Sequence, residues 1–394
     1  MPRQKAVGLR AVFRRELKRM GSTRLYLFLM VVFPLLSFAL LWATFHQQVP
    51  RDLPVAVHDA DHSALSRRMI RMLDATSTLR VAAAVADMET GKKHILEKKA
   101  YALIVFPLDF EKDIRKGKSS PVVCFYNAQY LLAGSLITRE VRNVAATASV
   151  TLNVGLRLQK GEMKPAAVTH AEAIRAELHG LFNPGLNYVH YLVNALLPTM
   201  LQIFIILVSV QSAGSELKEG TARQWQECAG SKTWKAVAGK MLPQTMVFSL
   251  MGLFMISLLY RFMGVPLRGS TGMIALGTLL FVLSYQAIGL LLTAWLANLR
   301  LATSVSAFYT GPAFAFTGIT FPYMAMPLPG KLWANILPLT HYLRLLVEQA
   351  VRGAQPADSL PELVILSVFT IIALSAAGPR LAHVMRDKRY WGRT

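Results

Sequence analysis

Cysteine and acidic residues are both scarce in this chain of 394 residues. With only 2 cysteines, no framework of disulfides can hold any part of it together. The 22 Asp and Glu residues face 43 Lys and Arg residues, which gives a formal net charge of +21. Charged residues make up 16% of the chain and hydrophobic residues 53%, with a mean hydropathy of +0.38. This composition excludes an ordinary soluble protein and indicates a protein that crosses a membrane.

Long apolar runs are abundant instead. About 20 apolar residues in a row suffice to cross a bilayer. Six segments meet this length, at 24–45, 188–213, 239–261, 271–297, 301–322 and 360–379. The first is not a cleavable signal peptide, because its apolar run is longer than a signal core and no small-residue cleavage site follows it. The sequence therefore predicts a polytopic α-helical membrane protein with six transmembrane helices.

The placement of positive charge predicts the orientation. The first 24 residues carry eight Lys and Arg residues against one acid, Glu16, and further basic clusters lie in 214–240 and in the tail 380–394. Positively charged flanks stay in the cytoplasm. We therefore expect both termini and the 214–240 segment on the cytoplasmic side, which agrees with an even number of spans. Residues 1–23 suit a basic amphipathic helix on the inner leaflet, and an unstructured basic flank remains the alternative.

A long polar insertion, residues 46–186, separates the first two spans, and this topology places it outside the cytoplasm. It is large enough to be a domain. Short apolar strands alternate with helical patterns, which predicts a small α/β layer fold. The expected strands are 53–58, 79–85, 101–106 and 121–126, and the expected helices are 63–75, 88–98, 108–116 and 131–158. A further helix is expected between residue 158 and the second span.

No catalytic or metal site is predicted. Gly117-Lys118-Ser119 resembles the end of a phosphate-binding loop, but position 112 is Lys where that loop needs Gly. Asp59, Asp61 and His62 cluster after the first strand, and we interpret them as a turn in which Asp61 or Ser63 caps the next helix. Cys124 and Cys228 are predicted to lie on opposite sides of the membrane, so they cannot pair.

The segment 216–225 is a charged turn between two apolar runs. Gly220 is a helix stop, and Thr221 with Gln224 three residues later matches a capping box. This pattern predicts a short cytoplasmic helix near 214–236, set at an angle to the preceding span. Such a helix can receive force from a soluble partner, and an ordinary loop remains the alternative.

The fifth apolar segment is irregular. Small residues and prolines interrupt it at Gly311, Pro312, Ala315, Gly318 and Pro322. Short amphipathic pieces follow near 323–345. Broken backbone at membrane depth must be buried in protein or line a cavity, so we expect a re-entrant helical hairpin on the outer side, with a plain loop as the alternative. Arg344 and Glu348 are spaced to pair along one helix face.

Four stretches, in order along the chain, resemble the ABC-2 transporter permease family over nearly its whole length. They are 53–66, 101–110, 216–225 with Gly239-Lys240-Met-Leu-Pro243, and 316–327 with 337–343. The chain departs from the family at Gln226-Glu-Cys-Ala229, where many members have an apolar run that ends in Pro.

The resemblance implies the permease subunit of an ABC exporter in the inner (plasma) membrane, non-catalytic, without a cofactor of its own and without a nucleic-acid partner. A separate cytoplasmic ATPase would bind ATP and Mg²⁺. A second permease chain, identical or paralogous, would complete a dimer, and the extracytoplasmic α/β domain would meet a periplasmic adaptor protein in some assemblies.

Two residue sets follow from the same resemblance. The ATPase-coupling set is Glu216, Glu219, Gly220, Thr221, Gln224 and Trp225, with Trp225 as the anchor in the ATPase groove. The pathway or gate set is Gly311, Pro312, Ala315, Gly318 and Pro322.

A membrane sensor whose external domain binds a ligand is the alternative function. A membrane-embedded enzyme is disfavoured because the spans contain almost no ionisable residues.

Overall fold

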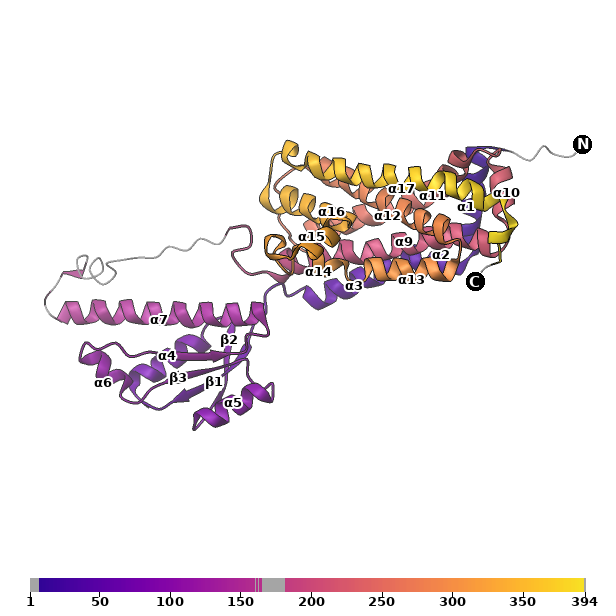
Figure 1. The fold of residues 1–394 in the computed structure, drawn as a ribbon. Coiled ribbons are helices and arrows are strands. Elements are labelled where there is room, and N and C mark those ends of the chain that lie inside the picture. The colour runs from indigo at the N-terminus through magenta and orange to yellow at the C-terminus, as the bar shows by residue number, and fades with distance from the viewer. Residues whose placement is uncertain (1–6, 160, 162, 165–180, 393–394) are drawn as a thin grey trace, which may run out of the picture. The chain divides into compact units, whose positions relative to one another are not determined.

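The computed structural model describes residues 7–159, 161, 163, 164 and 181–392. The chain divides into two compact units (Figure 1). The helical unit comprises Met1–His46 and Asn187–Thr394, and the inserted unit comprises Gln47–Leu186. The helix expected between residue 158 and the second long apolar helix lies mostly outside the described residues.

The inserted unit is built on a four-stranded sheet. Its strands are β1 (Leu53–Asp59), β2 (Leu79–Ala84), β3 (Ala102–Phe106) and β4 (Val123–Tyr126), in the order β2-β1-β3-β4. The pairs β1–β2 and β1–β3 are parallel, whereas β4 runs antiparallel to β3. The helices are α4 (Ala64–Asp74), α5 (Met88–Leu96), α6 (Phe110–Arg115) and α7 (Leu131–Gln159). Each of these strands and helices was predicted from the sequence.

The two faces of this sheet are covered by different helices. Val55 and Val57 of β1 belong to one buried cluster with residues of α4 and α7, among them Leu73 and Leu136. Ala56, one residue out of phase on β1, belongs to a second cluster beside α5. Side chains alternate between the two faces of a strand, so the run of apolar residues in β1 reflects burial on both faces.

Five helical segments of the helical unit are long and apolar enough to cross a membrane. They are Arg24–Phe45 (α2, Arg24–Leu27; η1, Phe28–Val32; α3, Phe33–Phe45), Val189–Lys218 (η2, Val189–Val193; α9, Asn194–Lys218), Thr233–Phe262 (α11, Thr233–Ser257; η3, Leu258–Phe262), α12 (Thr271–Leu296) and Pro356–Arg386 (η6, Pro356–Ser359; α17, Leu360–Arg386). The chain is therefore a polytopic helical membrane protein, as predicted.

The predicted span 301–322 is divided in the structure. It forms α13 (Leu299–Thr310) and the single turn α14 (Ala313–Phe316). The 12 residues of α13 rise about 18 Å, which is short of the roughly 30 Å hydrocarbon core. Pro312 lacks a backbone N–H and cannot continue α13. A count of six spans therefore stays a prediction.

The last predicted span ends too early. We expected it to stop at Pro379, but α17 continues through this proline to Arg386. Leu381 and Val384 are completely buried beyond Pro379. This packing holds the helix in place although the proline removes one backbone hydrogen bond.

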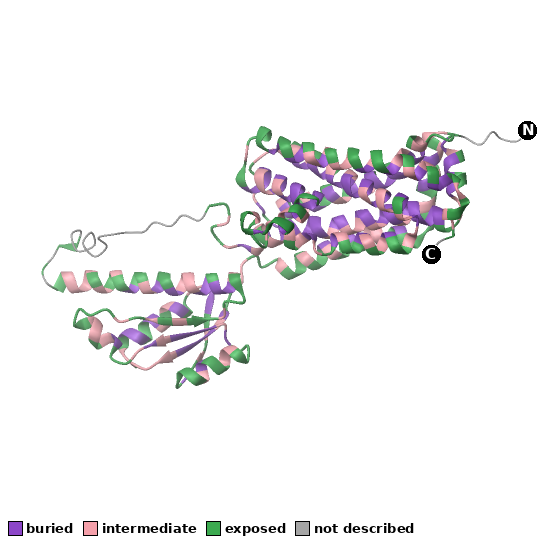
Figure 2. Cartoon of the chain, in the orientation of Figure 1, coloured by how far each residue is buried: buried purple, intermediate pink, exposed green. Residues whose placement is uncertain are grey.

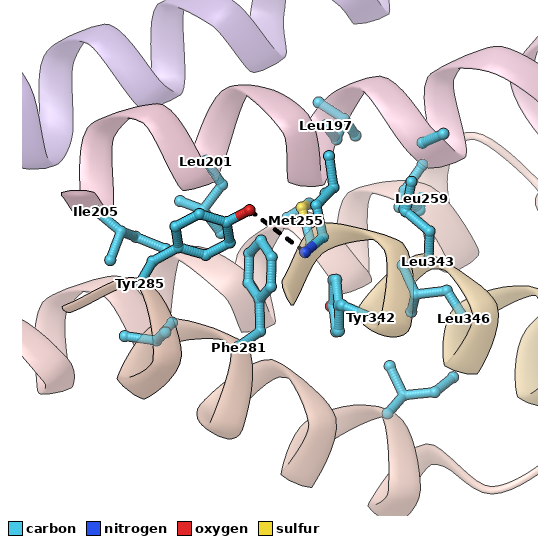
Figure 3. Close-up of a cluster of buried hydrophobic side chains, with 14 of the residues drawn as sticks. Leu197, Leu201, Ile205, Met255, Leu259, Phe281, Tyr285, Tyr342, Leu343 and Leu346 are labelled. Carbon is cyan, nitrogen blue, oxygen red and sulfur yellow. Dashed lines mark hydrogen bonds between the residues drawn. The ribbon is translucent and has the colours of Figure 1, made fainter. Parts of the chain in front are cut away.

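The segment 323–352 forms a helical hairpin in the helical unit. Its parts are η4 (Tyr323–Ala325), α15 (Leu328–Asn335) and α16 (Pro338–Leu346), which continues as the π-helix η5 (Val347–Arg352). In Figure 3, the Tyr342 ring of α16 stacks on Phe281 of α12, with centroids 4.4 Å apart. The Leu339 N–H donates to the Tyr285 hydroxyl over 3.3 Å. The hairpin is thus part of the apolar core, and its depth in a membrane stays a prediction.

Both ends of the described chain lie at the same end of the helical unit as α10 (Ala222–Cys228) (Figure 1). The Gly8 N–H donates to the Cys228 carbonyl over 2.8 Å, and the Gly392 N–H to the Leu217 carbonyl over 3.0 Å. α3 ends at the opposite end of the helical unit (Figure 1). The ring of Phe45, its last residue, stacks on Tyr188 with centroids 6.1 Å apart. The two joins to the inserted unit are therefore adjacent.

The long helices differ in burial (Figure 2). The most apolar window of Val189–Lys218 is 72% buried, against 22% for Arg24–Phe45 and for Pro356–Arg386. The two exposed segments present large apolar side chains such as Leu40 and Ile371. Apolar surfaces of this extent suit contact with lipid or with another membrane-spanning chain.

Candidate functional site

The charged turn after α9 contains the predicted short helix, α10. Gly220 adopts φ +70, a left-handed conformation that glycine accepts without steric cost, and α9 stops just before it. The capping-box prediction is wrong, because the Thr221 side chain makes no capping bond to α10. Its hydroxyl donates instead to the Glu216 carboxylate, a charged acceptor and hence a stronger one than neutral groups.

Glu216 is the centre of a network of charged side chains. Both of its carboxylate oxygens accept from the Arg15 guanidinium, over 2.7 and 2.8 Å. Arg19 donates to it over 2.6 Å and reaches Glu219 over 2.8 Å. Arg15 and Arg19 belong to α1 (Leu9–Ser22), about 200 positions away along the chain. The bidentate Arg–carboxylate pair fixes geometry as well as supplying energy.

A second carboxylate completes the network from the other side. Lys240 of α11 lies between Glu16 and Glu216, with N–O distances of 2.6 and 3.0 Å. Glu16 also accepts from the Ser212 hydroxyl over 2.7 Å and from the Gln244 amide over 3.1 Å. The exposed fractions of Glu16, Glu216 and Lys240 are only 1%, 0% and 2%.

The network is balanced in charge, since three basic side chains face three acidic ones. Taking charges out of water is costly, and the cost is compensated only when each charge has close partners. Glu219 is exposed, but removing Glu16, Glu216 or Lys240 leaves a buried charge without one of its partners. The arrangement therefore holds α1, the end of α9 and the start of α11 in one relative position, directly beside α10.

Close packing of α1 against α11 stabilises the same relative position of these helices. A Cβ added at Gly239 would lie 2.7 Å from Val12 Cβ, so α1 can approach α11 only because residue 239 is glycine. Trp225 of α10 is fully buried, and its indole N–H donates to the Ala236 carbonyl over 3.0 Å. The Lys240 ammonium lies 4.8 Å from the Trp225 ring centroid. The prediction that Trp225 anchors a partner is therefore wrong, because its ring is a core contact.

The outward face of α10 carries different residues. Arg223, Gln224 and Glu227 are exposed, and Arg223 pairs with Glu227 over 2.9 Å. Trp234, at the start of α11, is 62% exposed. Tryptophan is enriched at binding surfaces, so an exposed one is a candidate contact residue. Of the predicted coupling residues, Gln224 faces outward, whereas Glu216 and Trp225 are fully buried.

The predicted gate residues lie in the divided segment. Gly311 and Ala315 are exposed; Gly311 lies with Pro312 in the break between α13 and α14, and Ala315 lies in α14. Gly318 adopts φ +86, and a Cβ there would meet Tyr323 at an ordinary contact distance of 3.4 Å. A left-handed backbone, independent of any partner helix, already explains a glycine at 318.

Comparison with known proteins supports the family resemblance. Residues 24–378 match the model of the ABC-2 family transporter proteins. The chain belongs to the ABC-2 transporter family. It is also 20% identical over 333 residues to "Probable multidrug ABC transporter permease YbhR" of Escherichia coli K12 and of Escherichia coli O157:H7, a match that covers 84% of this chain and 85% of each relative.

In this ABC-2 family protein the charge network involves residues that were absent from the predicted site. Arg15, Glu16 and Arg19 entered the sequence analysis only through the charge balance that predicts orientation, and Lys240 only through that balance and the family resemblance of Gly239-Lys240-Met-Leu-Pro243. Two features of the sequence indicated that Glu16 and Lys240 pair with other charged residues. Glu16 is the one acid in a strongly basic segment, and Lys240 begins an otherwise apolar run. A buried charged side chain needs a partner of opposite charge. An acid among basic residues, or a cation in an apolar run, is therefore expected to pair if it is buried.

The predicted Arg344–Glu348 pair is absent from this ABC-2 family protein. Arg344 lies 3.7 Å from Glu362 of α17, and Glu348 accepts from the Ser359 hydroxyl over 2.8 Å. The π-helix beginning at Val347 changes the residue phase on which the i, i+4 spacing depends. Glu362 also accepts from His341 over 2.6 Å, an ion pair or neutral bond according to protonation.

The described residues contain no group of three or more potential metal ligands. In the inserted unit, the Asp59 carboxylate accepts from the backbone of Asp61 and His62 and from the Ser66 hydroxyl. Ser63 caps α4, accepting from the Ser66 N–H over 3.0 Å. The cluster is thus a helix cap, as interpreted from the sequence. Cys124 and Cys228 are both free.

Proposed function

We propose that this chain is the permease subunit of an ABC exporter of the inner membrane, driven by a separate ATPase subunit through α10. The observation that carries the proposal is the buried charge network beside α10. It ties the short helix to α1 and to two long apolar helices, so a displacement of α10 moves the spans with it. The family match and the permease names of the two relatives support the same role.

In this proposal the outward face of α10 docks into the ATPase. Gln224, Arg223 and Glu227 supply polar contacts, and Trp234 replaces Trp225 as the aromatic anchor. Glu216, Glu219, Gly220 and Thr221 act indirectly, by positioning α10. ATP and Mg²⁺ bind to the partner, and this chain is non-catalytic. Closure of two ATPases on ATP would bias the helical unit between two arrangements.

The remaining topology belongs to the proposal. α13 and α14 together form the sixth span, and the 323–352 hairpin is re-entrant from the outer side. Both termini and α10 are cytoplasmic, supported by their shared end of the helical unit and by the basic flanks. The inserted unit is extracytoplasmic, where a periplasmic adaptor is a further candidate partner. Two permease chains enclose the pathway, with the segment from Gly311 to Pro322 as its gate.

The proposal is tested by recovering the ATPase with the tagged chain from its native membrane. We expect the wild-type chain to copurify with an ABC ATPase subunit and Trp234→Ala to recover less of it, because the anchor is lost. Trp42→Ala is the matched control, since Trp42 is also exposed but lies on α3. Failure of any ATPase to copurify with the wild-type chain would contradict the proposal.

A further inference from the structure

The inserted unit contains a groove between α7 and the loop that joins α6 to β4. Its volume is about 700 Å³, which lies within the 300–1,000 Å³ range of small-molecule sites. The side chains of α7 form one wall, and residues of the α6–β4 loop and of β4 form the other. The groove lies entirely within this unit, of which α6 and α7 are labelled in Figure 1.

The floor of the groove is apolar. Ile114 of α6, Val122 before β4 and Leu152 of α7 line it, and each packs on the buried core of the unit while remaining partly exposed. Leaving apolar surface in water costs about 25 cal/mol per Å². A ligand that covers these three side chains therefore gains binding energy without any rearrangement of the core.

The rim of the groove is positively charged. Lys118 of the α6–β4 loop and Arg142 of α7 both line it and are exposed. In the described part of the chain, neither forms an ion pair, and the residues lining the groove include no acid. Two cations above an apolar floor are complementary to a ligand with a negatively charged head and an apolar tail.

We propose that this groove binds a small amphiphilic anion, such as a long-chain aliphatic carboxylate. Its tail covers Ile114, Val122 and Leu152, and its carboxylate lies beside Lys118 and Arg142. The Gly117-Lys118-Ser119 motif, which fails as a nucleotide-binding loop, acquires a role as part of the anion-binding rim. This inference stands apart from the proposed export function, because it concerns binding to the inserted unit alone.

Cys124 provides a reporter inside the groove. Its side chain is among the lining residues, and burial raises the pKa of the thiol to about 11. Alkylation of Cys124 in a Cys228→Ser background is measured at one fixed pH, with the full chain in phosphatidylcholine nanodiscs. We expect dodecanoate to slow the alkylation in a saturable way, because the bound ligand covers the thiol, and 1-dodecanol to protect far less.

Charge variants identify the rim. Arg142→Gln and Lys118→Gln should each raise the half-protecting dodecanoate concentration roughly fivefold, the effect of losing one partly exposed ion pair. Lys92→Gln is the matched control, because Lys92 is exposed on α5, which covers the other face of the sheet. Its half-protecting concentration should equal that of the parent.

Three results would overturn the inference. Equal protection by dodecanol and dodecanoate would remove the role of the rim. Equal effects of Lys92→Gln and Arg142→Gln would indicate non-specific attraction to the unit. A thiol that reacts only after denaturation, with no ligand added, would show that another part of the protein already covers the groove.

Discussion

At the residue scale, one carboxylate has an unusually large share of the contacts between distant parts of the chain. Glu216 accepts from Arg15 and Arg19 of α1, from Lys240 of α11 and from Thr221 before α10. It is fully buried, so water cannot replace a lost partner. The consequence is that substitutions here act on the relative position of four elements at once, and single changes are expected to be costly.

Lys240→Met tests this cost. The substitution leaves Glu16 and Glu216 buried without their shared cation, which should destabilise the protein by about 3 to 5 kcal/mol. In a thermal unfolding experiment on purified protein, the midpoint should fall by roughly 5 °C. The exposed Lys232 of the same turn gives the control, since Lys232→Met removes a charge without uncovering a buried one. Equal midpoints for the two variants would refute the role of the network.

Thr221 and Gln224 distinguish the observed hydrogen bond from the capping box. Thr221→Ala should cost about 1 kcal/mol, because Glu216 loses a donor. Gln224→Ala should change the free energy of unfolding by less than about 0.5 kcal/mol, since Gln224 is exposed. A capping box would make both changes destabilising. Unfolding by heat or denaturant, with both variants measured side by side, decides between them.

At the element scale, local signals predicted the inserted unit well. Its strands and helices alternate with clear turns, so each could be located from apolar pattern alone, and Ser63 was correctly expected as a helix cap. The end of the helical unit that contains α10 could not be predicted as well. Gly220 marked the break before α10, but the inward direction of Trp225 and the partners of Arg15 depend on contacts between segments about 200 positions apart, which leave no local pattern.

For the divided fifth segment, the sequence likewise predicted only part of the local structure. Gly311-Pro312 showed where the helix is interrupted, but not that Gly318 has a left-handed backbone. This changes the meaning of a substitution. Any side chain at 318 strains the backbone by about 1 to 2 kcal/mol, so Gly318→Leu cannot report on a partner helix alone. Ala315, which is helical and exposed, is the better probe.

Ala315→Cys tests whether this segment faces a second permease chain. In a background without Cys124 and Cys228, oxidation should crosslink two chains through residue 315, and less efficiently when ATP is trapped by the partner ATPase. Leu250→Cys, on the exposed face of α11, is the control and should remain uncrosslinked. Crosslinking at residue 250 and none at residue 315 would contradict the proposal, because it would place the interface and the pathway at the α11 face of the helical unit.

At the scale of the whole molecule, the two free cysteines and the two units define a topology experiment. Leu108→Cys places a thiol at a site of the inserted unit that is 72% exposed. A membrane-impermeant thiol reagent should label it in intact cells, because this unit is proposed to be extracytoplasmic. Cys228, the last residue of α10, should be labelled only after the membrane is permeabilised.

The native Cys124 is a poor substitute for the engineered thiol. Its raised pKa of about 11 keeps it protonated at neutral pH, and only the thiolate reacts. Its labelling rate should therefore rise about tenfold for each unit of pH between 7 and 9. Labelling of Cys228 but not of Leu108→Cys from outside would reverse the orientation of the protein.

The adjacency of Phe45 and Tyr188 has a consequence for the biogenesis of the chain. A segment whose two attachment points touch can be removed or added without changing the path of the chain on either side. Arg24–Phe45 must nevertheless wait for about 140 further residues to be synthesised before Val189–Lys218, its neighbour in the core, emerges. During synthesis the inserted unit therefore has time to fold as a unit before Arg24–Phe45 packs against Val189–Lys218.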